Sequence, residues 1–126
     1  MSIDLLVEKY IVQLDEGLLS SFFDMISNKM TDMKDKVFVR TRIIPEVEQL
    51  KLHFDKVSTD RALVGKFKDI YLEFMKNGKV MGFNKASNYA KTKFNNSVSG
   101  IPIKYRIGIL TLADEIFGQK IPSWSN

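Results

Sequence analysis

Seven basic side chains fall in a stretch of the chain that contains no carboxylate. Between Glu73 and Asp114 lie forty consecutive residues without Asp or Glu, and the basic residues among them are Lys76, Lys79, Lys85, Lys91, Lys93, Lys104 and Arg106. Clustered positive charge attracts polyanions, such as nucleic acids or acidic protein surfaces, although it says little about fold. The stretch is therefore the first place to look for a binding surface.

The densest part of this stretch is the segment 83–96, with the sequence FNKASNYAKTKFNN. Apolar residues recur in it at helical spacing, so one face is expected to pack on the core and the other to carry polar side chains. Lysine neutralises phosphates, asparagine forms paired hydrogen bonds with adenine, and tyrosine stacks on unpaired bases. The sequence therefore predicts a nucleic-acid surface in which two residues contact bases, Asn88 and Tyr89, and six contact phosphates, Lys79, Lys85, Lys91, Lys93, Lys104 and Arg106.

Two functions fit these side chains. The first is a non-enzymatic nucleic-acid-binding accessory protein, because a surface that serves solubility alone normally mixes both signs of charge. The alternative is a protein-interaction module, an adaptor or inhibitor that docks on an acidic surface of a larger protein machine, since such a surface also presents negative potential.

A homodimer is a third kind of association that the sequence leaves open. The adjacent pairs Leu18-Leu19 and Phe22-Phe23 widen an apolar stripe beyond one helical face. A central place in the core is the simpler explanation of such a stripe, and an interface is the alternative. Trp124 is an aromatic anchor that either docks on a partner or folds back on its own domain.

Patterns typical of catalysis and metal binding are missing. The chain has no cysteine, and His53 is its only histidine, so thiolate chemistry and a zinc site made of several histidines are excluded. His53 lies on a predicted amphipathic helix, and we assign it no function. Gly78 and Gly82 surround Lys79 but lack the spacing of a phosphate-binding loop. We therefore expect no enzymatic activity, no metal and no cofactor.

The two halves of the chain differ in charge. Residues 1–60 hold eight basic and eleven acidic side chains and residues 61–126 hold eleven and four, so the net charges are −3 and +7. The beginning of the chain does not resemble a signal peptide, and no apolar run approaches the roughly 20 residues of a membrane span. We expect a cytoplasmic protein without a membrane partner. Its short, cysteine-free composition, rich in Lys, Asn, Phe and Met, is similar to that of small accessory proteins of bacteriophages.

Helical spacing of apolar residues dominates the chain. It predicts helices from Ser2 to about Ile26 with a bend or division at Gly17, from Pro45 to Val57, from a cap at Asp60 to a stop at Gly78, over 84–95, and from Pro102 to Gly118. The last helix is expected to face inward with Ile103, Ile107, Leu110, Ala113 and Phe117. Residues 1–126 should thus form one compact all-α domain of five or six helices with an irregular tail at 119–126.

Residues 37–44, VFVRTRII, are the most strand-like run, because β-branched residues dominate it. A strand needs a partner, and the only hairpin signal is Asn77-Gly78. Residues 63–74 before that signal follow helical spacing, which favours a helix there. We therefore expect residues 37–44 to be helix or an extended connection. An α+β fold with a small hairpin around Asn77-Gly78 is the alternative.

Overall fold

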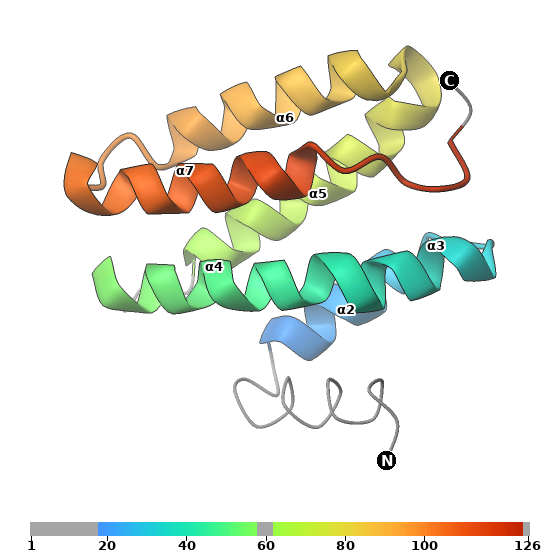
Figure 1. Ribbon diagram of the computed structural model, residues 1–126, viewed down its shortest axis with the longest axis horizontal. Coiled ribbons are helices and arrows are strands. Elements are labelled where there is room, and N and C mark those ends of the chain that lie inside the picture. The colour runs from blue at the N-terminus through green and yellow to red at the C-terminus, as the bar shows by residue number, and fades with distance from the viewer. Residues whose placement is uncertain (1–17, 58–61, 125–126) are drawn as a thin grey trace.

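The computed structural model describes residues 18–57 and 62–124, and every regular element in these ranges is a helix (Figure 1). In chain order they are α2 (Leu18–Asn28), α3 (Met33–Phe38), the π-helix η1 (Val39–Ile43), α4 (Ile44–Val57), α5 (Ala62–Met81), α6 (Phe83–Ser97) and α7 (Ile103–Phe117). The predicted all-α single domain is confirmed. The α+β alternative is wrong, since residues 18–57 and 62–124 contain no strand. The predicted caps at Ser2 and Asp60 and the division at Gly17 lie outside the described residues.

The strand-like run 37–44 is helical and contains a π turn. The N–H of Ile44 donates to the carbonyl of Val39, five residues earlier, and Thr41 Oγ1 donates to the carbonyl of Val37 at 2.8 Å. In a regular α-helix a proline clashes with the carbonyl four residues before it. The wider π turn contains Thr41, the residue four before Pro45, where this clash would fall. The chain therefore continues from α3 through η1 into α4 without a break, and its buried β-branched residues pack as a helix.

The core is built on one aromatic face of α5. Phe67, Tyr71 and Phe74 are fully or almost fully buried, and their spacing of three and four residues places them on one side of the helix. Phe117 of α7 lies with its ring centre 5.2 Å from that of Phe67, and Phe22 of α2 lies 6.0 Å from it on another side. Rings at these separations contribute about 1 kcal/mol per pair beyond the area that they bury. This face therefore holds helices from both halves of the chain.

The other helices surround α5 in a fixed arrangement. α5 and α6 form an antiparallel hairpin, α7 packs against α4 and α6, and α2 packs against α4 and α5. In the view of Figure 1, α5 crosses the molecule behind α7. Ser87 of α6 is buried and its Oγ donates to the carbonyl of Phe117 at 2.6 Å, which joins α6 to the end of α7.

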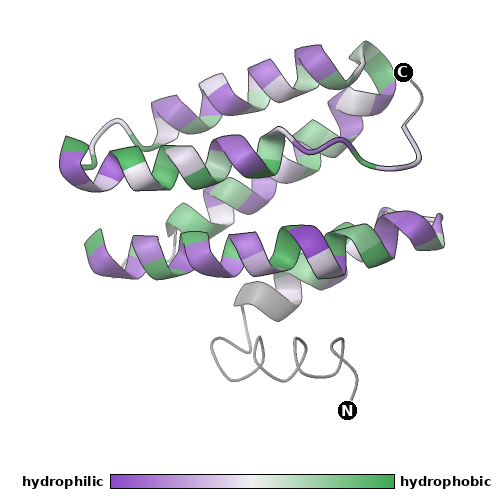
Figure 2. Ribbon diagram, in the orientation of Figure 1, coloured by the Kyte–Doolittle hydropathy of each residue, from purple (hydrophilic) through white to green (hydrophobic). Residues whose placement is uncertain are grey.

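The inward face of α7 differs from the prediction. Ala113 and Phe117 are buried as expected, but Ile103 is 58% exposed and Ile107 is 60% exposed, while Ile109 and Ile116 are buried. Apolar residues occur around much of this helix (Figure 2), so their spacing alone does not select one face. The contacts of α7 with α4 and α6 fix its rotation.

The end of α5 also differs from the prediction. The helix continues through Gly78 to Met81, and the turn into α6 is the single residue Gly82, whose φ of 89° suits glycine. Gly78 is buried because the indole of Trp124 lies directly against it, and a Cβ at Gly78 would overlap this ring. Trp124 is only 8% exposed and its ring centre lies 5.2 Å from that of Phe74. The tryptophan thus folds back on its own domain.

Replacing Gly78 with alanine should displace Trp124. We expect Gly78→Ala to lower the free energy of unfolding by about 2 kcal/mol, since an added methyl in a packed contact costs about 1–3 kcal/mol. The emission of Trp124, the only tryptophan, should shift to the red. Urea unfolding followed by tryptophan fluorescence measures both effects.

Gly65→Ala is the matched control in the same helix. A Cβ at Gly65 meets no atom within 4 Å, so this substitution should raise stability by up to about 1 kcal/mol through helix propensity. Equal effects of the two substitutions would contradict the close packing of Trp124 on Gly78.

Candidate functional site

The polar residues predicted on α6 do not form one surface. Lys85 and Asn88 are exposed and Tyr89 is 50% exposed, and helical spacing places all three on the side of α6 that faces away from the core. Lys91 follows the buried Ser87 by one turn and lies on the flank toward α7. Lys93 lies on the opposite flank, since two residues turn a helix by about 200°. Three of the five predicted residues on α6 therefore share its outer face, and Lys93 borders that face beside Tyr89, with its Nζ 5.8 Å from the centre of the Tyr89 ring.

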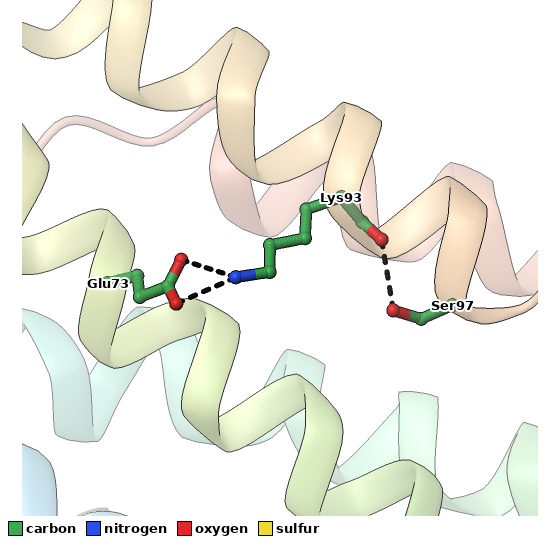
Figure 3. Close-up of polar contacts among 3 residues, drawn as sticks. All are labelled: Glu73, Lys93 and Ser97. Atoms are coloured by element: carbon green, nitrogen blue, oxygen red, sulfur yellow. Dashed lines mark hydrogen bonds and ion pairs between the residues drawn. The ribbon is translucent and has the colours of Figure 1, made fainter.

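Lys93 is held by an acid on the neighbouring helix. Its Nζ lies 2.7 and 2.9 Å from the two carboxylate oxygens of Glu73 on α5 (Figure 3). The hydrogen bond to Glu73 raises the pKa of the Lys93 ammonium, so Lys93 keeps its proton at neutral pH. One turn later, Ser97 Oγ donates to the carbonyl of Lys93 at 2.9 Å. Lys93 therefore joins α6 to α5, and Glu73 neutralises its charge.

The two predicted residues on α7 also have local contacts. Arg106 Nη1 donates to the carbonyl of Ser99 at 2.7 Å and so fixes the turn between α6 and α7. Lys104 Nζ lies 4.9 Å from the ring centre of Tyr105, within range of a cation–π contact. The structure thus distributes the eight predicted residues over several surfaces.

Lys79, the remaining predicted residue, belongs to a groove beside the end of α5. The groove has a volume of about 540 Å³, within the range of ligand-binding clefts. Its lining comes from the last turns of α5 and from the residue that follows α2: Lys29, Leu72, Glu73, Met75, Lys76, Lys79 and Val80. We call it the lysine-rimmed groove.

The charge of the lysine-rimmed groove is positive and its floor is apolar. Lys29, Lys76 and Lys79 are exposed, and none has a carboxylate within 4 Å among the residues that the structure describes. The one acid in the lining, Glu73, already binds Lys93. Val80 is 79% exposed, although it is a large apolar side chain. The groove can therefore take a ligand that is both apolar and anionic.

A smaller cavity of about 170 Å³ adjoins this groove and shares Lys29, Met75 and Lys79 with it. The tail after α7 lies along the cavity, because Asp35 at the start of α3 holds Ser123. Asp35 is 5% exposed, and its carboxylate accepts one hydrogen bond from the N–H of Ser123 at 2.9 Å and another from the Ser123 hydroxyl. This latch keeps Trp124 in place beside the groove.

Sequence reasoning missed Lys29 and did not assign Lys76 to a site. Lys76, Lys79 and Val80 follow a spacing of three and four residues on the exposed side of α5, and this spacing could have indicated a shared face. Lys29 lies in the acidic half of the chain, forty-seven residues before Lys76. No local pattern links the two, so only the packing of α2 on α5 shows that they meet.

Metal ligands do not gather in the described part of the chain. Among residues 18–57 and 62–124, no three His, Asp or Glu side chains lie where they could hold a metal ion together. His53, to which no function was assigned, has its Nδ1 2.9 Å from the carbonyl of Gln49, and its ring packs near Gly108 of α7.

Comparisons with known proteins found no match for this chain among protein-family models, curated proteins or solved structures. Within the described ranges, no helix combines the length and the hydropathy needed to cross a membrane. The shape and charge of the surfaces described above are therefore the features of the molecule that bear on its function.

Breaking the latch should free the tail. We expect Asp35→Ala to lower the free energy of unfolding by about 2 kcal/mol, because hydrogen bonds to a charged group contribute about 1.5–3 kcal/mol. Hydrogen exchange of the Ser123 amide should become at least about tenfold faster. This corresponds to a decrease of about 1.4 kcal/mol in the free energy of local opening. Hydrogen exchange and urea unfolding measure the two effects.

Two further variants control this experiment. Ser123→Ala keeps the backbone hydrogen bond to Asp35 and should lose about half as much stability. Asp55→Ala removes an exposed acid that pairs with Lys51 and should leave the exchange of Ser123 unchanged. Unchanged exchange in Asp35→Ala would show that the latch does not hold the tail.

Proposed function

We propose that this protein is a non-enzymatic protein-interaction module that binds an acidic, amphipathic segment of a partner in its lysine-rimmed groove. One observation carries the proposal: three lysines without a carboxylate partner among the described residues surround an apolar floor. The lysines alone could bind any polyanion. The apolar floor requires a ligand that also carries apolar groups, and this favours a polypeptide, because nucleic-acid interfaces are more polar than protein interfaces.

The size of the groove suits a short peptide segment. Leu72 and Val80 lie eight residues apart on α5, which is about 12 Å along the helix. This length matches two turns of a bound helix or about four residues of an extended chain. Two apolar side chains of such a segment fit the floor beside Met75, and flanking carboxylates meet the lysines. Electrostatic attraction then sets the rate and the orientation of binding.

A pair of synthetic peptides tests this function. The first is a fluorescein-labelled 15-residue helix with leucines on one face and glutamates elsewhere, and the second carries lysine at every glutamate position. We expect the acidic peptide to bind and the basic peptide not to bind. The double variant Lys76→Glu, Lys79→Glu should weaken binding at least about tenfold, or 1.4 kcal/mol, as measured by fluorescence anisotropy.

Lys66→Glu is the matched control, since Lys66 is an exposed lysine of the same helix outside the groove.

Methyl NMR locates the site. The Met75 methyl signal should shift when the acidic peptide is added, and the Met33 signal should not, since Met33 lines neither cavity. Equal binding of the two peptides, or equal effects of Lys66→Glu and the groove variant, would refute the proposal.

The outer face of α6 supports nucleic-acid binding as a second candidate. Lys85, Asn88, Tyr89 and Thr92 are exposed together, and α6 carries no carboxylate. Its phosphate contacts are fewer than the sequence predicted, because Lys93 and Arg106 are engaged within the protein. Four of the six predicted phosphate contacts remain, so the logarithmic salt slope on duplex DNA should be about −3.6 or shallower, since each neutralised phosphate contributes about −0.9. The four are Lys79, Lys85, Lys91 and Lys104.

A salt series tests this second candidate. Single-stranded and duplex 20-mers should bind more weakly as salt rises, and Lys85→Glu should weaken binding at least about tenfold, while Lys66→Glu should have a smaller effect. Tyr89→Ala should weaken only the single-stranded complex, because stacking on an unpaired base contributes about 1–3 kcal/mol. A slope near zero would exclude phosphate contacts and leave the peptide groove as the function.

A further inference from the structure

The outer face of α7 exposes large apolar side chains that no other described helix covers. Ile103 is 58% exposed and Ile107 is 60% exposed, and Thr111 continues the same line at a spacing of four residues. Clusters of exposed aliphatic side chains commonly mark interfaces. None of these residues lines the lysine-rimmed groove, so this face is a separate surface.

The charges of α7 oppose its helix dipole. Lys104 and Arg106 lie in the first turn, where the helix carries partial positive charge, and Asp114 and Glu115 lie in the last turn, where it carries partial negative charge. Each such placement disfavours an isolated helix by about 0.3–1 kcal/mol. The arrangement is unfavourable for a single α7, but it suits an antiparallel neighbour with the same sequence.

Glu115 is also close to another acid of its own molecule. Burial and then the charge of Glu115 raise the pKa of the Glu46 carboxyl on α4, while hydrogen bonding from Gln119 and the charge of Arg42 act against them. An added cation at Glu115 would relieve this repulsion.

We propose that α7 forms the two-fold interface of a homodimer in which Lys104 pairs with Glu115 of the partner subunit. The helical register supports this pairing. Lys104 and Glu115 are eleven residues apart, which is about 16 Å along the axis and within about 20° around it. Both therefore lie on the same side of α7. A two-fold axis between positions 109 and 110 places each lysine against the other copy's glutamate. In this register each Ile107 lies within one residue of the level of Thr111 of the partner subunit.

The association should be weak. α7 has 15 residues and is about 22 Å long, so one helix face buries less area than a standard protein interface. We expect a dissociation constant on the order of 100 µM at low salt. The protein should be monomeric at 10 µM and largely dimeric at 1 mM.

Substitutions that reverse the charge of Lys104 or Glu115 test the proposed pairing. Sedimentation velocity in 50 mM salt, from 10 µM to 1 mM, should show a dimer for the original chain and monomers for Lys104→Glu and for Glu115→Lys, with the dissociation constant raised at least about tenfold. An equimolar mixture of the two variants should dimerise again, because in the heterodimer each glutamate faces a lysine. Both substitutions suit the helix dipole better, so circular dichroism should show folded variants.

Two controls separate this interface from other surfaces. Lys85→Glu makes the same charge change as Lys104→Glu on α6 and should leave dimerisation intact. Val80→Asp alters the lysine-rimmed groove and should also leave it intact. A monomer at every concentration, a mixture that stays monomeric, or a dimer that Val80→Asp breaks while Lys104→Glu does not, would each overturn the proposal.

Discussion

The aromatic face of α5 is the constraint on which the rest of the structure depends. Phe67, Tyr71 and Phe74 are buried together, and rings from α2 and α7 pack on them. Once this face points inward, the opposite side of α5 must point to solvent. Lys76 and Val80 lie on that opposite side, so packing of the core also creates the exposed wall of the lysine-rimmed groove. Core and candidate site are two faces of one helix.

The close approach of Trp124 to Gly78 connects the end of the chain to this arrangement. The absence of a side chain at Gly78 lets the indole lie against the backbone of α5, and Asp35 holds the adjacent Ser123. The tail thereby covers the core next to the groove, and Lys29, Met75 and Lys79 line both cavities. A change in the tail is therefore expected to alter the shape of the lysine-rimmed groove.

Charge in this protein is used in three different ways. Lys93 and Arg106 satisfy partners within the domain and stabilise the contacts of α6 with its neighbours. The three lysines of the groove have no such partners in the described part of the chain, which makes them available to a ligand. Lys104 and Glu115 lie at the ends of α7 that their charges do not suit, and we propose that a second copy of the helix pairs with them. A high net positive charge alone distinguishes none of these uses.

The sequence by itself determined the all-α class, the approximate extent of α6 and the difference in net charge between the two halves of the chain. These properties follow from the spacing and type of neighbouring residues, such as Phe83, Ala86, Ala90 and Phe94, which are buried or partly buried as predicted. The β-branched run 37–44 had a strong local preference for strand, and helix packing overrode it because no second strand exists in the described ranges to pair with it.

Tertiary structure alone decided which charges meet. Lys29 and Lys76 share the groove although they are distant in sequence, and Lys91 and Lys93 separate although they are neighbours. The same holds for α7, whose apolar residues occupy much of its circumference, so its contacts with α4 and α6 selected the buried side. The physical reason is that periodicity reports only the faces of a single helix. The groove arises where faces of different helices come together, and their mutual packing is a property of the folded chain.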